Sequence, residues 1–504
     1  MFQGYRIDIT AFEKYKEKIV NLVDQRLHQI HTPHTTDKRN NYEKAINNLK
    51  KHYIITTADK ASSNYVIVCK YFYIRTLLKE LGITCRQGSI LAIGNTTYKP
   101  TTKDLLSIHK KHSKHLKSIH PSITYVTPAE NIAILYGLPK LHKIPYKFRY
   151  IAGASNTTAT ALATILLHTL KHFQQHFIRY TNVIQQRTGK RTYWAIKNNT
   201  KVLQCVNSIK DNSLVYTGDF STMYTNLPHN IIFRNIFKLF DMLYANAGKQ
   251  FVTFKDRGTY GYSKPYYSNE RTINSFNFDI TSIKELTEVV IHDSFIRCGK
   301  QILRQTSGIP MGGNASPLLA DLTLSYMEYE YLNSIGSNLA MRNHNIFRYV
   351  DDIIAFNCPN FMELAQDIYP DDIPLERTNN DDYSAHYLDI NINTHDRRMR
   401  LYDKRRDFNF AVNQVTNPSS CVHKKQLYGI FTGQFIRTLR ITNRLEDVID
   451  ETSQLVNDYI DAGYSKDILI LHLCKVCTRH QELLCKFGLF DKKHVYKSLI
   501  RKVC

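Results

Sequence analysis

Two adjacent carboxylates, Asp351 and Asp352, stand between two short runs of β-branched and aromatic residues. Each run is typical of a buried strand, so the pair is predicted at the tip of a tight hairpin. Adjacent acids repel one another, and a bound divalent cation relieves that repulsion. An ordinary Asp-rich turn is the alternative, because Asp favours turns for conformational reasons alone. The apolar strands on both sides favour the metal site.

A third carboxylate, Asp219, ends the predicted buried strand over residues 214–220. Two-metal nucleotidyl transfer needs carboxylates that hold two Mg²⁺ ions about 3.5–4 Å apart, one lowering the pKa of an attacking hydroxyl and the other stabilising the leaving pyrophosphate. One hairpin cannot surround both ions, so a neighbouring strand must supply a further acid. We therefore expect Asp219, Asp351 and Asp352 to be catalytic and to hold two Mg²⁺ ions, with Mn²⁺ as the alternative metal.

A glycine-rich stretch, residues 307–319, lies between these acids and begins another predicted helix. Glycine allows the backbone to approach a flat ligand such as a base pair, where a Cβ atom would collide. In this order, Asp219, the glycine-rich stretch and Tyr349–Asp352 resemble the palm motifs of reverse transcriptases. More narrowly, the chain resembles the Penelope-like retroelement polymerases, which are relatives of telomerase.

The resemblance runs from about residue 59 almost to the C-terminus. It rests on short motifs in register: Asp59–Asn64, Gly137–Pro145 with Arg149–Ile151, Asp219–Pro228, Tyr387–Ile390, Tyr402–Phe408 and Tyr428–Ile430. It implies an α+β right-hand polymerase with mixed fingers, a palm built on an antiparallel sheet, and a helical thumb.

The resemblance also implies a nucleotide site. Lys140 and Arg149 match the fingers positions that clamp the triphosphate, for which a lysine point charge and a planar guanidinium are well suited. Tyr224 matches the aromatic residue that closes the sugar pocket against a 2′-hydroxyl, which makes DNA the expected product; a plain core tyrosine is the alternative. Phe220 would offer its backbone carbonyl to a metal, with its ring packed in the core.

Three further residues complete the expected site. Met311 and Gly312 should lie beneath the templating base pair. Arg377 occupies the position that often supplies a lysine to the pyrophosphate. Because the pKa of arginine is above 12, Arg377 could stabilise the leaving group by charge but is a poor proton donor. The basic residues within 402–406 are expected to meet primer phosphates, which adds affinity without sequence selectivity.

The expected domains are an N-terminal helical extension (1–50), fingers (51–160), a palm (161–405) with an insertion or loop at about 248–277, and a helical thumb (406–504). The stretch Ser282–Glu285 has the form of a capping box. In the thumb, Arg437, Arg440 and Arg444 are predicted on one side of the first helix, facing a nucleic-acid duplex.

The implied reaction is RNA-templated addition of deoxynucleotides to a primer 3′-hydroxyl. Its partners would be an RNA template, a DNA primer or target with a free 3′-OH, and dNTPs. Only half of a GIY-YIG nuclease signature is present, at Tyr428–Ile430, so 3′ ends would come from elsewhere or from an endonuclease on another chain. The alternatives are a viral RNA-dependent RNA polymerase and a domesticated, non-catalytic RNA-binding protein.

Bulk composition agrees with a polyanionic partner, since the formal charge is +23 and the pI about 9.4. The ten cysteines are scattered, which indicates a reducing compartment, the nucleus or cytoplasm. No apolar run approaches the roughly 20 residues that span a bilayer.

Four side chains near the end of the sequence are either a zinc site or buried thiols with a histidine: Cys474, Cys477, His480 and Cys485. A basic cluster before the sole tryptophan, Arg187–Arg191, is a candidate contact with the template backbone.

Overall fold

The computed structural model describes the following residues: 17–18, 21, 36–86, 89–119, 131–141, 144–220, 222–258, 261–336, 344–412 and 415–503. The chain divides into two compact units, Met1–Thr56 with Ile67–Ile74, and Thr57–Val66 with Arg75–Cys504. The smaller unit contains helix α2 (Thr36–His52), which ends in Lys50, Lys51 and His52. Most of the N-terminal helical extension expected over residues 1–50 lies outside the described residues.

The early strands and helix follow the sequence pattern. Strand β1 (Tyr53–Ala58) and strand β2 (Ala61–Cys69) form a two-stranded sheet, and helix α3 (Lys70–Glu80) comes next. The turn between β1 and β2 contains Lys60 at φ 64°, in the left-handed region. Strands β3 (Ile83–Arg86) and β4 (Ser89–Ala92) form a second small hairpin.

A five-stranded sheet, here called the fingers sheet, has the order β5-β13-β12-β6-β7. The basic hairpin predicted from the sequence is present in it as β6 (Ala133–Lys140) and β7 (Lys147–Gly153), while His142 and Lys143 lie outside the described residues. Its other members are β5 (Tyr98–Pro100), β12 (Phe295–Cys298) and β13 (Gln301–Gln305). The sheet therefore joins strands from both sides of the fingers–palm boundary expected at residue 160.

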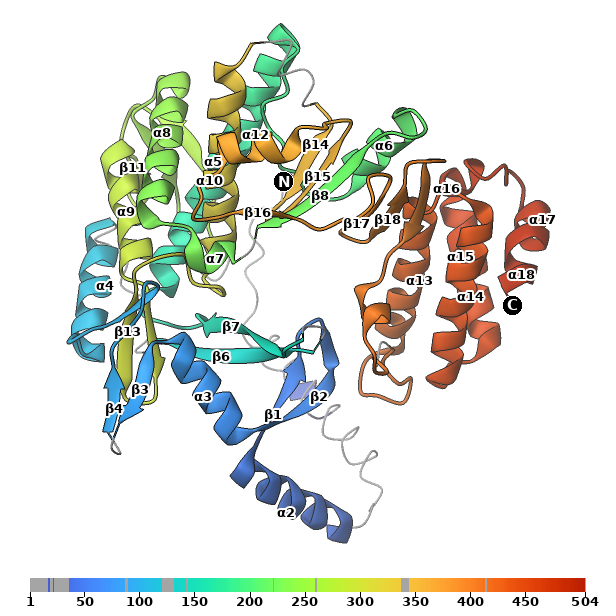
Figure 1. Cartoon of the computed structure of the whole chain (residues 1–504), viewed down its shortest axis with the longest axis horizontal. Helices are drawn as coiled ribbons and strands as arrows, with labels where there is room; N and C mark the ends of the chain where they lie inside the picture. The colour runs from blue at the N-terminus through green and yellow to red at the C-terminus, as the bar shows by residue number, and fades with distance from the viewer. Residues whose placement is uncertain are drawn as a thin grey trace. The chain divides into compact units, whose positions relative to one another are not determined.

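A four-stranded antiparallel sheet, here called the palm sheet, lies at the centre of the larger unit (Figure 1). Its order is β14 (Ile346–Tyr349), β15 (Asp352–Phe356), β8 (Val215–Phe220) and β16 (Leu375–Arg377). The core around it is formed with five helices: α5 (Thr160–Thr188), α8 (His229–Ala247), α9 (Ile280–His292), α10 (Ser316–Ser334) and α12 (Phe361–Ile368). Helix α10 is buried along most of its length, polar residues included, because α5, α8 and α12 all contact it.

The stretch expected as an insertion or loop at 248–277 is not a loop. It contains β9 (Phe251–Phe254), β10 (Tyr266–Ser268) and β11 (Phe276–Phe278), which pair in the order β10-β9-β11. Phe254 and Phe276 stack with ring centroids 4.9 Å apart in the main core. Alternating aromatic residues thus outweigh the Gly and Ser content in this stretch. The capping box expected at Ser282 is also displaced, since Asp279 caps α9 by accepting a hydrogen bond from the Ser282 amide.

The C-terminal part has its own hydrophobic core. Helices α13 (Lys424–Ile441), α14 (Leu445–Asp461) and α15 (Lys466–Arg479) contact one another pairwise, and Figure 1 shows them side by side. A three-stranded sheet precedes them: β17 (Ser384–Tyr387), β18 (Ile390–Asn393) and β19 (Arg398–Leu401). Phe431, Phe435 and Leu469 are fully buried between the helices. Among the described residues, no helix is both long and apolar enough to cross a membrane.

Candidate active site

The palm sheet brings Asp219 and Asp352 together, although 133 residues separate them in sequence. They are direct partners in the antiparallel pairing of β8 with β15. Asp351 lies in the two-residue turn between β14 and β15, after Val350 at φ 57°. Its backbone carbonyl accepts a hydrogen bond from the Phe220 amide at 3.3 Å. The three acids therefore gather at one end of the sheet, as two strand termini and one turn.

These acids form a negatively charged cluster. Burial, followed by the charges of Asp351 and Asp219, raises the pKa of Asp352 to about 6. Partial burial and then Asp351 raise the pKa of Asp219 as well. Lys404 and Lys60 oppose both shifts without cancelling them. Burial and repulsion thus disfavour the ionised acids, and a divalent cation would favour them.

The donor set suits a hard cation such as Mg²⁺, because all three side chains offer oxygen. Over the described ranges, no three His, Cys, Asp or Glu side chains already stand as a complete metal-ligand group. That arrangement is compatible with Mg²⁺, which proteins usually bind through one or two carboxylates while substrate phosphates and water supply the remaining ligands.

Residues on β16 fall on opposite faces of the palm sheet. Glu376 is the direct partner of Asp219. Its charge raises the pKa of Asp219, although less than burial and Asp351 do. Arg377 is the partner of Gly218 and therefore lies on the other face, because paired residues in an antiparallel sheet point the same way. There its guanidinium pairs with Asp382 and stacks 4.6 Å from the Tyr216 ring. The structure does not bring Arg377 to the acids, so its expected contact with pyrophosphate is not supported.

Two lysines lie near the acids, and an arginine lies near one of the lysines. Arg149 on β7 makes an ion pair with the buried Asp59 at 3.3 Å. The pKa of Lys60 is lowered, first by partial loss of hydration and then by Lys404, while Asp352 acts in the opposite direction. Lys60 thus lies within electrostatic range of both Lys404 and Arg149, and the two lysines lie within range of Asp219 and Asp352.

The two expected phosphate clamps share a face of the fingers hairpin. Arg149 pairs with Leu138, and Lys140 pairs with Lys147 two residues further along β6. Since side chains two apart on a strand point the same way, Lys140 and Arg149 lie on one side. The geometry is compatible with a joint contact to a polyphosphate.

The glycine-rich turn contacts both the palm and the fingers. Gly308 has φ 70°, and a Cβ atom there would lie 2.3 Å from the Tyr224 carbonyl oxygen. Gly312 has φ 116°, and a Cβ atom there would lie 2.2 Å from the Ala152 carbonyl oxygen on β7. The Ala152 amide donates to the Met311 carbonyl at 2.8 Å. Glycine is thus required at both positions by conformation and by space.

Tyr224 lies beside the acids, in the short helix α7 (Met223–Asn226). Burial, then the charges of Asp351 and Asp321, raises the pKa of Tyr224 to about 12. Its backbone carbonyl accepts a hydrogen bond from the Ile309 amide at 2.7 Å, which fixes it to the glycine-rich turn. Phe220 packs in the core as expected, edge-to-face with the Tyr369 ring at 4.7 Å.

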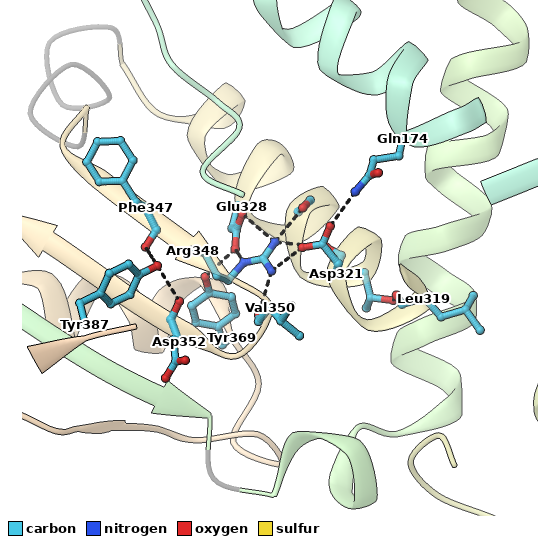
Figure 2. A network of polar contacts seen from close by, with 12 residues as sticks. Gln174, Leu319, Asp321, Glu328, Phe347, Arg348, Val350, Asp352, Tyr369 and Tyr387 are labelled. Atoms are coloured by element: carbon cyan, nitrogen blue, oxygen red, sulfur yellow. Dashed lines mark hydrogen bonds and ion pairs between the residues drawn. The ribbon is translucent and has the colours of Figure 1, made fainter. Parts of the chain in front are cut away.

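A buried ion network contacts the turn between β14 and β15, as Figure 2 shows. Arg348 is fully buried and pairs with Glu328, and its Nη1 contacts Asp321 at 2.8 Å. The same Nη1 donates to the Val350 carbonyl at 2.9 Å. Because Val350 immediately precedes Asp351, this bond ties the turn conformation to helix α10, which carries both buried acids. Tyr369 adds a hydrogen bond to Glu328 at 2.9 Å.

A second support comes from β17. The Tyr387 hydroxyl donates to the backbone carbonyl of Asp352 at 3.3 Å, and it lies 3.5 Å from the Phe347 carbonyl (Figure 2). Tyr387 itself is buried. This residue belongs to the Tyr387–Ile390 motif of the sequence resemblance, and here it contacts the backbone of the β14–β15 hairpin.

Several basic residues expected to meet nucleic acid are paired with acids instead. Arg437 on α13 contacts Asp389 at 2.8 Å, and Arg444, which is the N-cap of α14 rather than part of α13, contacts Asp396 at 2.6 Å. Arg440 is exposed. Within 402–406, the arginines also pair with acids: Arg405 with Asp403 at 2.7 Å and Arg406 with Glu451 at 2.9 Å.

The four zinc candidates do not form a metal-binding group within the described part of the chain. Cys477 is buried, which raises the pKa of its thiol, whereas Cys485 is exposed and its thiol donates to the Gln481 carbonyl. His480 contacts Glu482 at 3.2 Å.

Solved structures share this fold at low sequence identity. A telomerase from Candida albicans, solved with a TWJ fragment of telomeric RNA, has a TM-score of 0.54 and 12% identity over 90% of this chain and 70% of that chain. Apo telomerase from Candida tropicalis gives a TM-score of 0.47 and 10% identity over 91% and 76% of the two chains. An RNA-dependent RNA polymerase of a human picobirnavirus gives 0.38 and 10% over 99% and 92%. No protein-family model and no curated protein matches the sequence.

At this identity the first comparison establishes the fold. The α+β right-hand polymerase architecture expected from the motifs is therefore confirmed. Membership of the Penelope-like group stays a prediction.

Three residues near the acids are not predicted from the sequence. Nothing in the local pattern places Lys60 or Lys404 near the acids. Arg348 does carry a signal, because an arginine in the middle of an apolar strand indicates that a buried acid lies opposite.

Proposed function

We propose that this chain is an RNA-directed DNA polymerase that extends a primer 3′-hydroxyl with deoxynucleotides. The observation that carries the proposal is the convergence of Asp219, Asp351 and Asp352 at one end of the palm sheet. Together with the right-hand fold, a cluster of carboxylates of this kind favours nucleotidyl transfer.

Each group at the candidate active site has a proposed role. Asp219, Asp351 and Asp352 would hold two Mg²⁺ ions, which when bound lower the pKa of the primer hydroxyl and stabilise the charge on the leaving pyrophosphate. Lys140 and Arg149 would hold the triphosphate. Met311 and Gly312, fixed against β7, would support the templating base pair.

Two basic residues extend this assignment. Lys60 and Lys404 lie within electrostatic range of both Asp219 and Asp352. We assign them to the nucleotide and primer phosphates, whose charge would stabilise ammonium groups in that position. They replace Arg377, which lies on the opposite face of the sheet.

The substrate preference rests on Tyr224. Its position beside Asp351, with a backbone fixed to the glycine-rich turn, supports a role for the ring next to the 2′ position of an incoming nucleotide. A 2′-hydroxyl would collide with that ring, so dNTPs are the proposed substrates. We further propose that the chain belongs to the Penelope-like group, on the motifs given above.

The test uses purified full-length protein with a poly(rA) template, an oligo(dT) primer, dTTP and Mg²⁺. Extension of the primer is the expected result, and chelation of the metal should stop it. The control variant is Asp351→Asn, which should lose extension by at least a thousandfold and keep its thermal unfolding and duplex binding. Full activity in that variant would remove the catalytic assignment.

Two competing functions give different results in the same assay. A viral-type RNA-dependent RNA polymerase would incorporate UTP in preference to dTTP on the same template. A non-catalytic RNA-binding protein would bind the template–primer duplex and incorporate neither nucleotide.

A further inference from the structure

A polar cavity of about 230 Å³ lies apart from the acids, between helix α5 and the segment that leads into helix α6 (Thr200–Ser208). Its walls include Arg191 and Thr192 from that segment, and Asn182 and Gln185 from α5. Lys197 and Lys201 also line the cavity, and both side chains are exposed. None of the described residues that line this cavity is acidic.

The cavity contains a buried cation whose hydrogen bonding is incomplete. Arg191 is only 9% exposed, and its Nη1 donates to the backbone carbonyl of His344. Its guanidinium also lies 4.4 Å from the centroid of the Phe347 ring. Its Nη2, however, has no partner among the described residues, and Arg191 makes no ion pair with a described acid. A buried guanidinium without a counter-ion is costly, so an anion here would be strongly favoured.

Two further features of the walls suit an anion. The Thr192 hydroxyl is buried and also has no described partner. Helix α6 begins beside the cavity, with Asn198 and Lys201 on either side of its first residue. The Asn199 N-cap makes no side-chain hydrogen bond to the first turn. The Thr200 amide is already used, because it donates to the Asn198 side chain at 3.1 Å. The feature of α6 that favours an anion near the cavity is therefore the positive end of its helix dipole.

The charge state of the cavity is clear at neutral pH. Burial lowers the pKa of Arg191 to about 10, and the guanidinium is still protonated at pH 7. Partial burial and then Arg191 lower the pKa of Lys201, which shows that the cations repel one another. This uncompensated charge has no role in the proposed transfer reaction.

We propose that this cavity is a phosphate-binding site, distinct from the nucleotide site, formed by Arg191, Thr192, Lys197, Lys201 and the start of α6. A planar guanidinium with a free donor, a hydroxyl and two ammonium groups match the oxygens of a phosphate. The phosphate is either a free ion or part of a nucleic-acid strand, and in both cases its oxygens would accept hydrogen bonds from the same groups.

The chain offers a built-in probe, because Trp194 is its only tryptophan and stands between two cavity residues, Tyr193 and Ala195. The full-length protein is titrated with inorganic phosphate at constant ionic strength, set with KCl, while Trp194 fluorescence is followed. A saturable change is expected. Its absence would overturn the proposal.

Matched variants test the location of the site. Lys201→Glu changes the charge at the cavity end of α6, and Lys210→Glu makes the same change two residues beyond the other end. The first variant should weaken phosphate binding at least tenfold, and the second less than twofold. Equal losses in both would show general charge attraction and would also overturn the proposal. Both lysines are exposed, so neither variant should fail to fold.

Short RNA strands identify the source of the phosphate. An RNA that displaces inorganic phosphate only when it carries a 5′-phosphate shows that a strand end is bound, and displacement regardless of the 5′ group shows an internal phosphate. No displacement by either RNA assigns the site to the free ion. These experiments do not measure primer extension, so the phosphate-site proposal can fail while the proposed polymerase activity holds, and the reverse.

Discussion

At the scale of single residues, Tyr224 and Arg348 act on the same turn. Tyr224 lies next to Asp351, and its backbone is fixed to the glycine-rich turn. Arg348 donates to the carbonyl before Asp351. The first residue is proposed to select the sugar, and the second holds the turn in place.

Replacing Tyr224 should relax sugar selection. In Tyr224→Ala the ring that would collide with a 2′-hydroxyl is absent, so the ratio of kcat/KM for dTTP over UTP should fall by at least tenfold. The measurement is primer extension with each nucleotide alone. Tyr224→Phe keeps the ring and should keep the ratio, whereas an unchanged ratio in the alanine variant would exclude the sugar gate.

Replacing Arg348 should destabilise the fold. Arg348→Met leaves Glu328 buried without its counter-ion, and breaking such a pair costs about 3–5 kcal/mol. The Tm in a thermal unfolding experiment should therefore fall by several degrees. Arg348→Met combined with Glu328→Gln should recover part of the loss, because glutamine has no charge to bury. A single variant that melts like the wild type would contradict this role.

At the scale of elements, ion pairs connect the thumb helices to the β17–β19 sheet, and these pairs differ in how deeply they are buried. Asp447 on α14 is fully buried and contacts Arg398 at 2.5 Å and Arg400 at 3.3 Å. The nearby pair of Arg444 with Asp396 is exposed on both sides. Exposed pairs contribute little, so the buried acid is the main polar fastening.

This difference gives a matched pair of variants. Asp447→Ala should lower stability by about 3 kcal/mol, because two arginines lose a buried partner. Asp396→Ala should cost less than about 1 kcal/mol. Hydrogen exchange of α13–α15 should increase in the first variant and change little in the second. Equal effects would show that burial does not set the strength of this contact.

The elements were also what the sequence predicted best. The β14–β15 hairpin follows from two apolar runs on either side of the adjacent aspartates. Strand β6 of the β6–β7 hairpin alternates buried and exposed positions. The same two-residue period could have placed Arg377 on the face away from Asp219, had the pairing of β16 with β8 been known. The position of Lys404 near the acids could not be predicted, because it depends on the tertiary arrangement of distant segments. Neither could the partners of Arg348, since they lie on α10, where buried polar residues leave no amphipathic pattern.

At the scale of the whole molecule, buried neutral histidines make stability depend on pH. Burial lowers the pKa of both His112 and His172 to about 4. In the unfolded chain each would titrate near 6.5, so the unfolded state binds more protons between pH 6.5 and 4. Stability is therefore lost as the pH falls through that window.

At pH 5 each histidine should account for a loss of about 2 kcal/mol relative to pH 7. The Tm at the two pH values measures the loss. His172→Phe keeps a ring against Tyr267, 4.9 Å away in the wild type, and should melt with a smaller difference between pH 7 and pH 5. An identical difference would rule out His172 as a source of acid sensitivity.

One consequence of the fingers sheet concerns movement. Strand β13 leads within three residues to Gly308, and Met311 is bonded to β7 through Ala152. The β6–β7 hairpin and the glycine-rich turn are thus stiffly linked and cannot shift independently without breaking backbone hydrogen bonds. In a polymerase built this way, the release of pyrophosphate from the fingers hairpin and the advance of the template past the glycine-rich turn would be coupled movements.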